Sequence, residues 1–206
     1  MSAIREPGDE VLLTYASGTI DPGLSLLVEA HLELSAASRA RLAAFNGLAG
    51  AFLRDETPAG MKPGSLALAL ARIKQPVPEL VPLAPSSRGT VLSRLRDVRW
   101  RWAGPGSRIA PVSAAGSAMR MFLLRSAPGR ALARHGHSAL EWTVIMQGSY
   151  CDEHGHFPTG SFIEETAGDV HRPVVNSDVD CLCLIAMQGP IIGHGLGGMV
   201  ASWIMR

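Results

Sequence analysis

The most constraining feature of this sequence is a spaced set of histidines, a glutamate and glycines between residues 129 and 148. The stretch has the pattern G-x5-H-x-H-x3-E-x6-G, with His135, His137 and Glu141 as its polar members. Side chains two residues apart lie on the same face of a β-strand, and a turn after His137 can return Glu141 to the two imidazoles. Two imidazoles and a carboxylate are a ligand set for a divalent transition metal. The alternative is three surface polar residues that are neighbours only by chance.

A second pattern downstream supplies one more ligand. It reads G-x5-T-A-G-x2-H-x4-N from Gly160 and contains His171. The two patterns together resemble the two signature motifs of the cupin family, although threonine replaces a proline and the asparagine lies one residue late. The resemblance implies a jelly-roll domain with one divalent metal ion, zinc or else iron, manganese or nickel. Its expected ligands are His135, His137, Glu141 and His171.

The composition describes a globular chain and argues against several classes of protein. Of the 206 residues, 47% are hydrophobic and 18% charged, which is enough apolar content for a sizeable core. The net charge of +1 does not support a nucleic-acid-binding surface, so we expect no direct DNA binding. No apolar run reaches membrane-spanning length and the first residues lack a signal-peptide pattern, so a cytoplasmic protein is expected. Three cysteines do not indicate a disulfide framework.

Residues 1–74 are predicted to form a small helical domain. Asp9 and the pair Asp21–Pro22 are start signals for two helices, and Ser35 or Ser38 can cap a third. Apolar residues then repeat at helical spacing in three stretches, residues 24–32, 42–53 and 66–73. Each apolar stripe is one-sided, so these helices are expected to pack on each other or on a partner, with Leu27 as a candidate contact.

The second half of the chain has a different period. Closely spaced prolines mark residues 75–89 as an interdomain linker; an irregular loop inside one domain is the alternative. Beyond it, strands are expected at residues 98–102, 119–124, 141–146 and 181–185, separated by glycine-rich turns. The sequence therefore predicts an α+β multidomain protein with a helical domain (1–74), a Pro-rich linker (75–89) and an all-β cupin domain of the double-stranded β-helix or jelly-roll type (90–206). The glycine-rich tail, residues 190–206, suggests no particular element.

The helical half carries a pattern of its own, His31-x3-Ser35-x2-Ser38. It resembles the H-x3-C-x2-C junction of zinc-binding anti-sigma domains, with serine in place of both cysteines. In that family another histidine near the N-terminus completes the site, and residues 1–30 contain none. Because a hydroxyl is a poor zinc ligand at neutral pH, we expect no zinc in this domain, with the serines serving as caps. His31 is then an ordinary packed or surface histidine.

A short helical domain, a Pro-rich linker and a C-terminal cupin together resemble the ChrR-type anti-sigma factors over nearly the whole chain. The resemblance implies a transcription regulator of a stress response. Its helical domain would bind a group IV (ECF-type) sigma factor, and its cupin would sense an oxidative or chemical signal. The alternatives are a dioxygenase-like cupin metalloenzyme acting on a small organic acid or diketone, and a stand-alone ligand-binding cupin. The resemblance favours the regulator over an enzyme and leaves a homodimer open.

Two of the cysteines, Cys181 and Cys183, lie two residues apart on a predicted strand and therefore face the same side. Burial as small hydrophobic residues is their expected role. The alternative is oxidation, if that face lines the cupin pocket.

Overall fold

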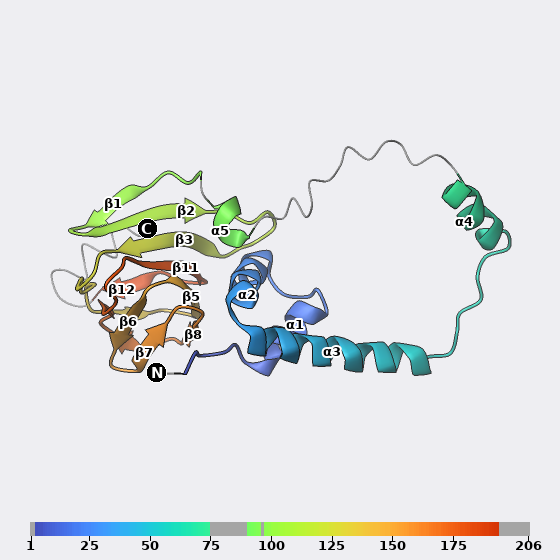
Figure 1. The fold of residues 1–206 in the computed structure, drawn as a ribbon, viewed down its shortest axis with the longest axis horizontal. Helices are drawn as coiled ribbons and strands as arrows, with labels where there is room; N and C mark the ends of the chain where they lie inside the picture. The colour runs from blue at the N-terminus through green and yellow to red at the C-terminus, as the bar shows by residue number, and fades with distance from the viewer. Residues whose placement is uncertain (1–2, 75–89, 96, 194–206) are drawn as a thin grey trace.

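The computed structural model describes residues 3–74, 90–95 and 97–193, so the predicted linker and most of the tail lie outside the described residues. In this part of the chain a helical half precedes a half built from short strands, as predicted (Figure 1). The helices are α1 (Asp9–Ala16), α2 (Pro22–Leu34), α3 (Ala36–Asp55), α4 (Ser65–Lys74) and α5 (Val91–Arg94). The strands are β1 (Arg101–Gly104), β2 (Ser107–Val112), β3 (Arg120–Ser126), β4 (His135–His137), β5 (Glu141–Gln147), β6 (Ser149–Asp152), β7 (Gly155–Pro158), β8 (Phe162–Glu165), β9 (Val170–His171), β10 (Val174–Val175), β11 (Cys181–Met187) and β12 (Ile191–Gly193).

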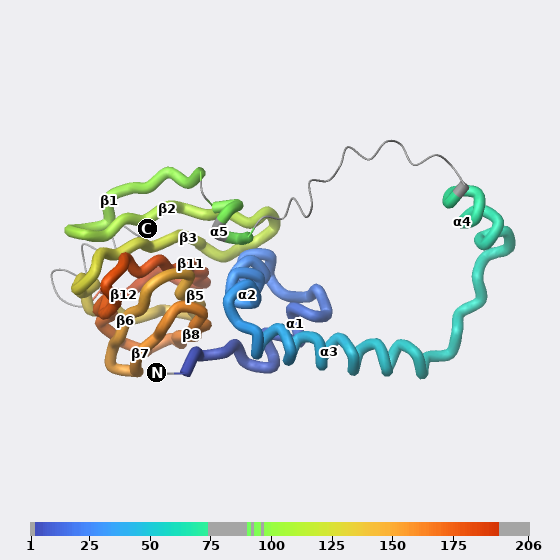
Figure 2. The backbone as a smooth tube through the Cα atoms, viewed as in Figure 1, coloured from blue at the N-terminus to red at the C-terminus, as the bar shows by residue number. Residues whose placement is uncertain are grey.

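The strands form three antiparallel sheets. A six-stranded sheet has the order β1-β2-β3-β11-β5-β8, and two three-stranded sheets have the orders β10-β6-β7 and β12-β4-β9. Figure 2 shows β6, β7 and β12 gathered on the side of the long sheet that faces away from α1, α2 and α3. Three predicted strands are present as β3, β5 and β11, whereas the one predicted at residues 98–102 begins only at Arg101. Within the described residues, no helix combines the length and the apolar character needed to cross a bilayer.

The central strands β5 and β11 are buried on both faces. On β5, Val144 belongs to a core shared with the helices, whereas its neighbour Ile145 belongs to a second core shared by the three sheets. Leu184 and Ile185 divide in the same way on β11. A strand covered on both faces has no solvent side to keep polar, which explains why both sequences read as nearly continuous apolar runs.

Helix α2 covers the outer face of the long sheet. Its start is fixed as predicted, because an Asp21 carboxylate oxygen accepts hydrogen bonds from the backbone N–H groups of Gly23 (2.7 Å) and Leu24 (3.4 Å). Leu27 and Val28 have no exposed surface and lie in the core shared with β5. Burial of one such side chain contributes about 1.5–3 kcal/mol. The prediction that Leu27 contacts a partner is therefore wrong, because the protein's own sheet already covers this side chain.

The shared core bears on the domain division predicted from the sequence. Residues of α1, α2 and α5 lie in one hydrophobic cluster with residues of β3, β5, β8 and β11. The predicted ranges 1–74 and 90–206 therefore mark a change of secondary structure, while the hydrophobic core crosses that boundary.

Helices α3 and α4 carry apolar side chains that the described residues do not cover. The N-terminal end of α3 packs near α1 and α2, and the rest extends away from the sheets (Figure 1). On that extension Phe52 is 65% exposed and Leu53 is 76% exposed. Helix α4 stands apart from the main body in Figure 1 and exposes Leu66, Leu68, Leu70 and Ile73. Both helices were predicted. Phe45 on the N-terminal part of α3 packs against the core shared with the sheet, whereas the large apolar side chains farther along α3 and those of α4 are exposed in the described part of the chain.

Candidate metal centre

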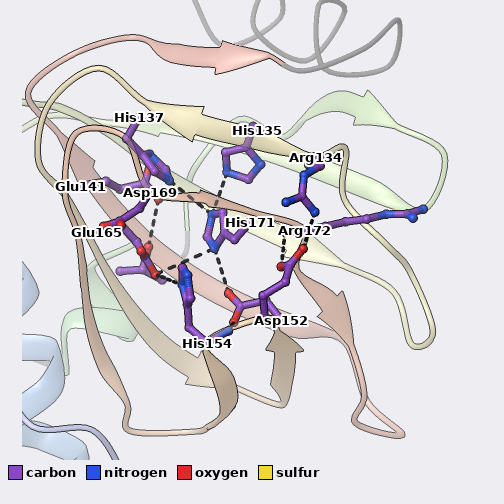
Figure 3. Close-up of polar contacts among 12 residues, drawn as sticks. Arg134, His135, His137, Glu141, Asp152, His154, Glu165, Asp169, His171 and Arg172 are labelled. Carbon is purple, nitrogen blue, oxygen red and sulfur yellow. Dashed lines mark hydrogen bonds and ion pairs between the residues drawn. The ribbon is translucent and has the colours of Figure 1, made fainter.

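Three buried imidazoles converge inside the cupin half, where β4 lies beside β9 (Figure 3). Strand β4 turns His135 and His137 to one face, and the register of the pair sets His171 opposite His135. The Nε2 atom of His171 lies 3.1 Å from that of His135 and 3.3 Å from that of His137. All three side chains are buried. Spacing along the sequence thus predicted three side chains that do share one point.

The hydrogen bonds made by the Nδ1 atoms of His135 and His171 place the Nε2 lone pairs of these two rings opposite one another. His135 Nδ1 lies 2.9 Å from the carbonyl oxygen of Ala133, and His171 Nδ1 lies 2.8 Å from Asp152 Oδ2. Both partners only accept hydrogen bonds, so each Nδ1 carries a proton, and a ring that carries no second proton has a bare Nε2. Burial and the nearby His171 lower the pKa of His135 to about 4, which keeps this ring neutral. Two bare nitrogens 3.1 Å apart fit a shared cation, because it would accept both lone pairs.

Glu141 lies beside the three imidazoles but not on their Nε2 side. Its Oε2 is 3.3 Å from Nδ1 of His137, and neither atom has a hydrogen-bond partner although both are buried. Burial lowers the pKa of His137, but the Glu141 carboxylate outweighs it, so the pKa of this imidazole is raised. The four predicted ligands are therefore neighbours, and the three histidines alone have ligand atoms within 4.8 Å of one another.

A cavity of about 50 Å³ opens beside the imidazoles. His135, Glu141 and His171 line one part of it, and the rest of its wall is mostly apolar. Cys181 and Cys183 also line it, with their sulfur atoms 3.7 Å apart, so their predicted burial is confirmed. The contact with Cys181, together with burial, raises the pKa of the Cys183 thiol well above its ordinary value. This thiol is therefore a weak nucleophile at neutral pH.

A second group of polar side chains adjoins the first and was not predicted. It consists of Asp152 at the end of β6, His154 in the following turn, Glu165 at the end of β8, and the other ring nitrogen of His171 (Figure 3). The ligand atoms of these four residues all lie within 4.8 Å of one another. Burial raises the pKa of Glu165, whereas hydrogen bonds from His171 and from the His154 N–H outweigh burial and lower the pKa of Asp152. Asp152 is thus the more readily ionised of these two carboxyl groups.

The residues that resemble a zinc junction form a different kind of cluster, which we call the Glu6 cluster: Glu6, His31, Ser35 and Ser38. His31 is fully buried, with Nδ1 2.8 Å from the carbonyl oxygen of Gly160 and Nε2 3.0 Å from Glu6 Oε2. Ser35 caps α3 by accepting from the N–H of Ser38 at 3.1 Å, and its hydroxyl donates to Glu6 Oε1 at 2.9 Å. The Ser38 hydroxyl also donates to Glu6. The predicted capping role of Ser35 is confirmed, and His31 is packed.

Sequence reasoning missed Glu6 because it looked for a histidine in the N-terminal segment. A lone carboxylate at residue 6 is an ordinary surface residue on its own. The second polar group was missed for a related reason, since Asp152 and His154 lie in a turn and Glu165 lies on another strand. A useful signal was present: the sequence Asp152-Glu153-His154 places a carboxylate and an imidazole two residues apart, beside a metal motif.

Comparison with known proteins agrees with this architecture. Residues 88–191 match the family described as the ChrR Cupin-like domain. The chain is 35% identical over 198 residues to the anti-sigma-E factor ChrR of Cereibacter sphaeroides, covering 93% of this chain and 92% of that protein. It is also similar to a chain in the crystal structure of Rhodobacter sphaeroides SigE in complex with the anti-sigma ChrR. That match has a TM-score of 0.74 and 34% identity, and covers 89% of this chain and 98% of the other.

These matches span both halves of the chain, including the helices that precede the cupin-like sheets. They confirm the resemblance drawn from the two histidine motifs, the helical half and the order of the two. The chain belongs to the ChrR family of anti-sigma factors with a C-terminal cupin-like domain.

Proposed function

We propose that this protein is an anti-sigma factor that binds an ECF-type sigma factor through its helical half and responds to an oxidative or chemical signal through its cupin half. The observation that carries this proposal is the apolar surface on the C-terminal part of α3 and on α4, which is exposed in the part of the chain that the structure describes. It occurs in a relative of ChrR, whose solved structure is a complex with SigE. The protein would act in the cytoplasm, where sigma factors meet RNA polymerase, and would need no DNA contact of its own.

The apolar surface has the character of a helix-mediated interface. Phe52 and Leu53 on α3 are exposed by more than half, as are Leu66 and Ile73 on α4. Water-exposed side chains of this size are costly when they are grouped, and such patches mark protein interaction sites. An amphipathic helix of a partner could be held between two such helices. Binding would cover on the sigma factor a surface that it otherwise presents to the polymerase.

The test is binding of the full chain to each ECF-type sigma factor of its own genome. Phe52→Asp and Leu53→Asp place a charge on the exposed part of α3 and should each weaken binding about 30-fold, as for interface residues worth 2 kcal/mol or more. Val179→Asp is the matched control, because Val179 is an exposed apolar residue of the cupin half. Circular dichroism should show all three variants folded. Absence of binding to every sigma factor, or wild-type binding by both α3 variants, would refute the proposal.

In the cupin half, we assign one divalent metal ion to His135, His137, Glu141 and His171, with zinc as the first candidate and iron, manganese or nickel as alternatives. The imidazoles would give the ion their Nε2 atoms, and a change of side-chain torsions would bring in Glu141, whose Oε2 has no hydrogen-bond partner. A bound ion would hold β4, β5 and β9 together and would supply a Lewis acid to a small molecule in the adjacent cavity.

The same cavity supports a second candidate, a cupin metalloenzyme acting on a small organic acid or diketone. Its apolar wall and its polar end at His135 and His171 suit a small molecule with one coordinating head group. Oxygen consumption by the iron-loaded, nickel-loaded or manganese-loaded protein with such compounds tests it. Turnover together with failure to bind any sigma factor would favour the enzyme.

A further inference from the structure

The polar group beside the imidazoles has the geometry of a second ligand set. Nδ1 of His171 lies 2.8 Å from Asp152 Oδ2 and 3.9 Å from Glu165 Oε1, and Nδ1 of His154 lies 3.6 Å from the same Glu165 oxygen. Ligand atoms about 2.0–2.2 Å from a tetrahedral ion lie roughly 3.3–3.6 Å apart, so these three distances bracket that range. Two imidazoles and two carboxylates are a donor set suited to zinc or manganese.

Burial makes this group hard to explain by hydrogen bonds alone. Glu165 is only 4% exposed, and its Oε1 has no hydrogen-bond partner, although it points at both histidines (Figure 3). The Asp152 side chain, which carries the second carboxylate, has no exposed surface. Hydrogen bonds from His171 Nδ1 and from the His154 N–H stabilise the Asp152 carboxylate, but no hydrogen bond reaches Glu165 Oε1. A buried carboxylate that has lost its hydration beside a second one is costly without a cation. A divalent ion would satisfy the orphaned oxygen and neutralise both groups.

His171 connects this group to the first. Its Nε2 faces His135 and His137, and its Nδ1 faces Asp152 and Glu165. We infer that Asp152, His154, Glu165 and Nδ1 of His171 form a second divalent-metal site, adjacent to the first and sharing the His171 ring with it. To bind both ions, His171 coordinates as an imidazolate, and its Nδ1 proton leaves to solvent. The full chain then holds two ions, one more than the sequence predicts.

Metal counts on single-residue variants test the shared ring. The untagged full-length protein is stripped with a chelator, equilibrated with zinc alone at buffered free concentrations, and analysed for zinc per chain. Wild type should saturate at two ions. Glu165→Gln and His154→Gln remove ligands of the second site only and should leave one, and His135→Ala should also leave one. His171→Ala belongs to both sites and should lose both ions.

Glu153→Gln is the matched control. Glu153 is a neighbouring carboxylate that faces Arg134 and the backbone N–H of Arg172 instead of the histidines, so this variant should keep two ions. His154 is partly exposed, so its substitution should leave the fold intact even if Glu165→Gln perturbs it; thermal melts of the metal-free proteins check both.

Saturation of wild type at one ion would overturn the inference and leave Asp152, with its neighbours, as groups that orient His171. Retention of two ions by both second-site variants, or of one ion by His171→Ala, would overturn it as well. None of these outcomes depends on sigma-factor binding, so the proposed function stands or falls separately.

Discussion

The Glu6 cluster and the imidazoles around His171 use similar side chains, but only the first is completed by hydrogen bonds. His31, Ser35 and Ser38 all contact the Glu6 carboxylate, and the other ring nitrogen of His31, Nδ1, lies within hydrogen-bond distance of a backbone carbonyl oxygen. Around His171, by contrast, bare nitrogens face each other, and buried atoms of His137 and Glu141 have no hydrogen-bond partner. In the Glu6 cluster, a central carboxylate satisfies the hydrogen bonds of the surrounding side chains. Around His171, lone pairs face one another, and a cation would be required to satisfy them.

The difference between the two clusters should disappear when the side chains of the Glu6 cluster are replaced by metal ligands. Because three side chains already converge on Glu6, the triple variant Glu6→His, Ser35→Cys, Ser38→Cys should acquire a stoichiometric zinc ion with His31. Apparent zinc affinities of thiolate-containing structural sites are about 10–16 kcal/mol at neutral pH. Zinc titration against a chromophoric chelator measures the gain over wild type. The single variant Glu6→His, with both serines retained, is the control and should gain nothing; an unchanged metal count in the triple variant would show that the geometry does not transfer.

Removal of metal should affect only the imidazoles around His171 and leave the Glu6 cluster unchanged. An ion present at 1,000 times its dissociation constant stabilises the folded state by about 4 kcal/mol, and a chelator should remove that stabilisation. His135→Ala and Glu141→Ala should lower both the metal content and the free energy of unfolding of the metal-loaded protein. Urea unfolding with and without chelator, paired with elemental analysis, measures both quantities. Full metal retention in both variants would refute the assigned ligands.

Loss of the central carboxylate should affect only the Glu6 cluster. Glu6→Ala removes the carboxylate that buried His31 and two serine hydroxyls contact and leaves only the contact between His31 Nε2 and Ser38 Oγ, which should cost about 2–3 kcal/mol of unfolding free energy. The zinc content should not change. Glu10→Ala, at an exposed acidic residue of α1, is the control and should stay within about 0.5 kcal/mol of wild type. Equal effects of the two variants would mean that Glu6 does not hold the cluster.

A smaller effect should appear in the dependence of stability on pH. Burial raises the pKa of Glu6, but hydrogen bonds from Ser38, Ser35 and His31 outweigh it, so the folded-state pKa lies below the ordinary 4.5. The stabilisation from the carboxylate is therefore present above pH 4.5 and is lost as the pH falls through the folded-state value. The difference in unfolding free energy between wild type and Glu6→Gln should shrink over that acidic range. A difference that grows on acidification would contradict the lowered pKa.

The parts of this structure that the sequence predicts are those encoded by short-range spacing. Asp21–Pro22 and the apolar repeat after it specify α2, and the pattern around His135 and His137 specifies two imidazoles on one strand face. His171 follows from a second local motif. In each case the deciding residues lie within about two turns of helix or one strand of each other, where backbone geometry fixes their relation.

The remaining features depend on contacts between distant segments. Nothing near Glu6 in the sequence indicates that it meets residues 25 to 32 positions later. The apolar stripes of α2 and α3 look alike as patterns, yet Leu27 is buried under the sheet and Leu53 is exposed. A one-sided apolar stripe indicates that one face of the helix packs against another surface. Only the folded chain shows whether that surface belongs to the same molecule.

The N-terminal segment gives the molecule a short thermodynamic link between its halves. The carbonyl oxygen of Arg5 accepts from the N–H of Phe162, and its guanidinium donates to the carbonyl oxygen of His154 at 3.1 Å. The next residue is Glu6, which accepts hydrogen bonds from Ser35 and Ser38 at the junction of α2 and α3. One peptide unit thus joins the turn that carries His154, beside the proposed metal ligands, to the helix that carries the exposed Phe52. If a partner displaces α3, the displacement strains that peptide and changes the free energy of the turn at His154. Thermodynamic linkage then requires that a change at the turn alter the affinity for the partner by the same free energy.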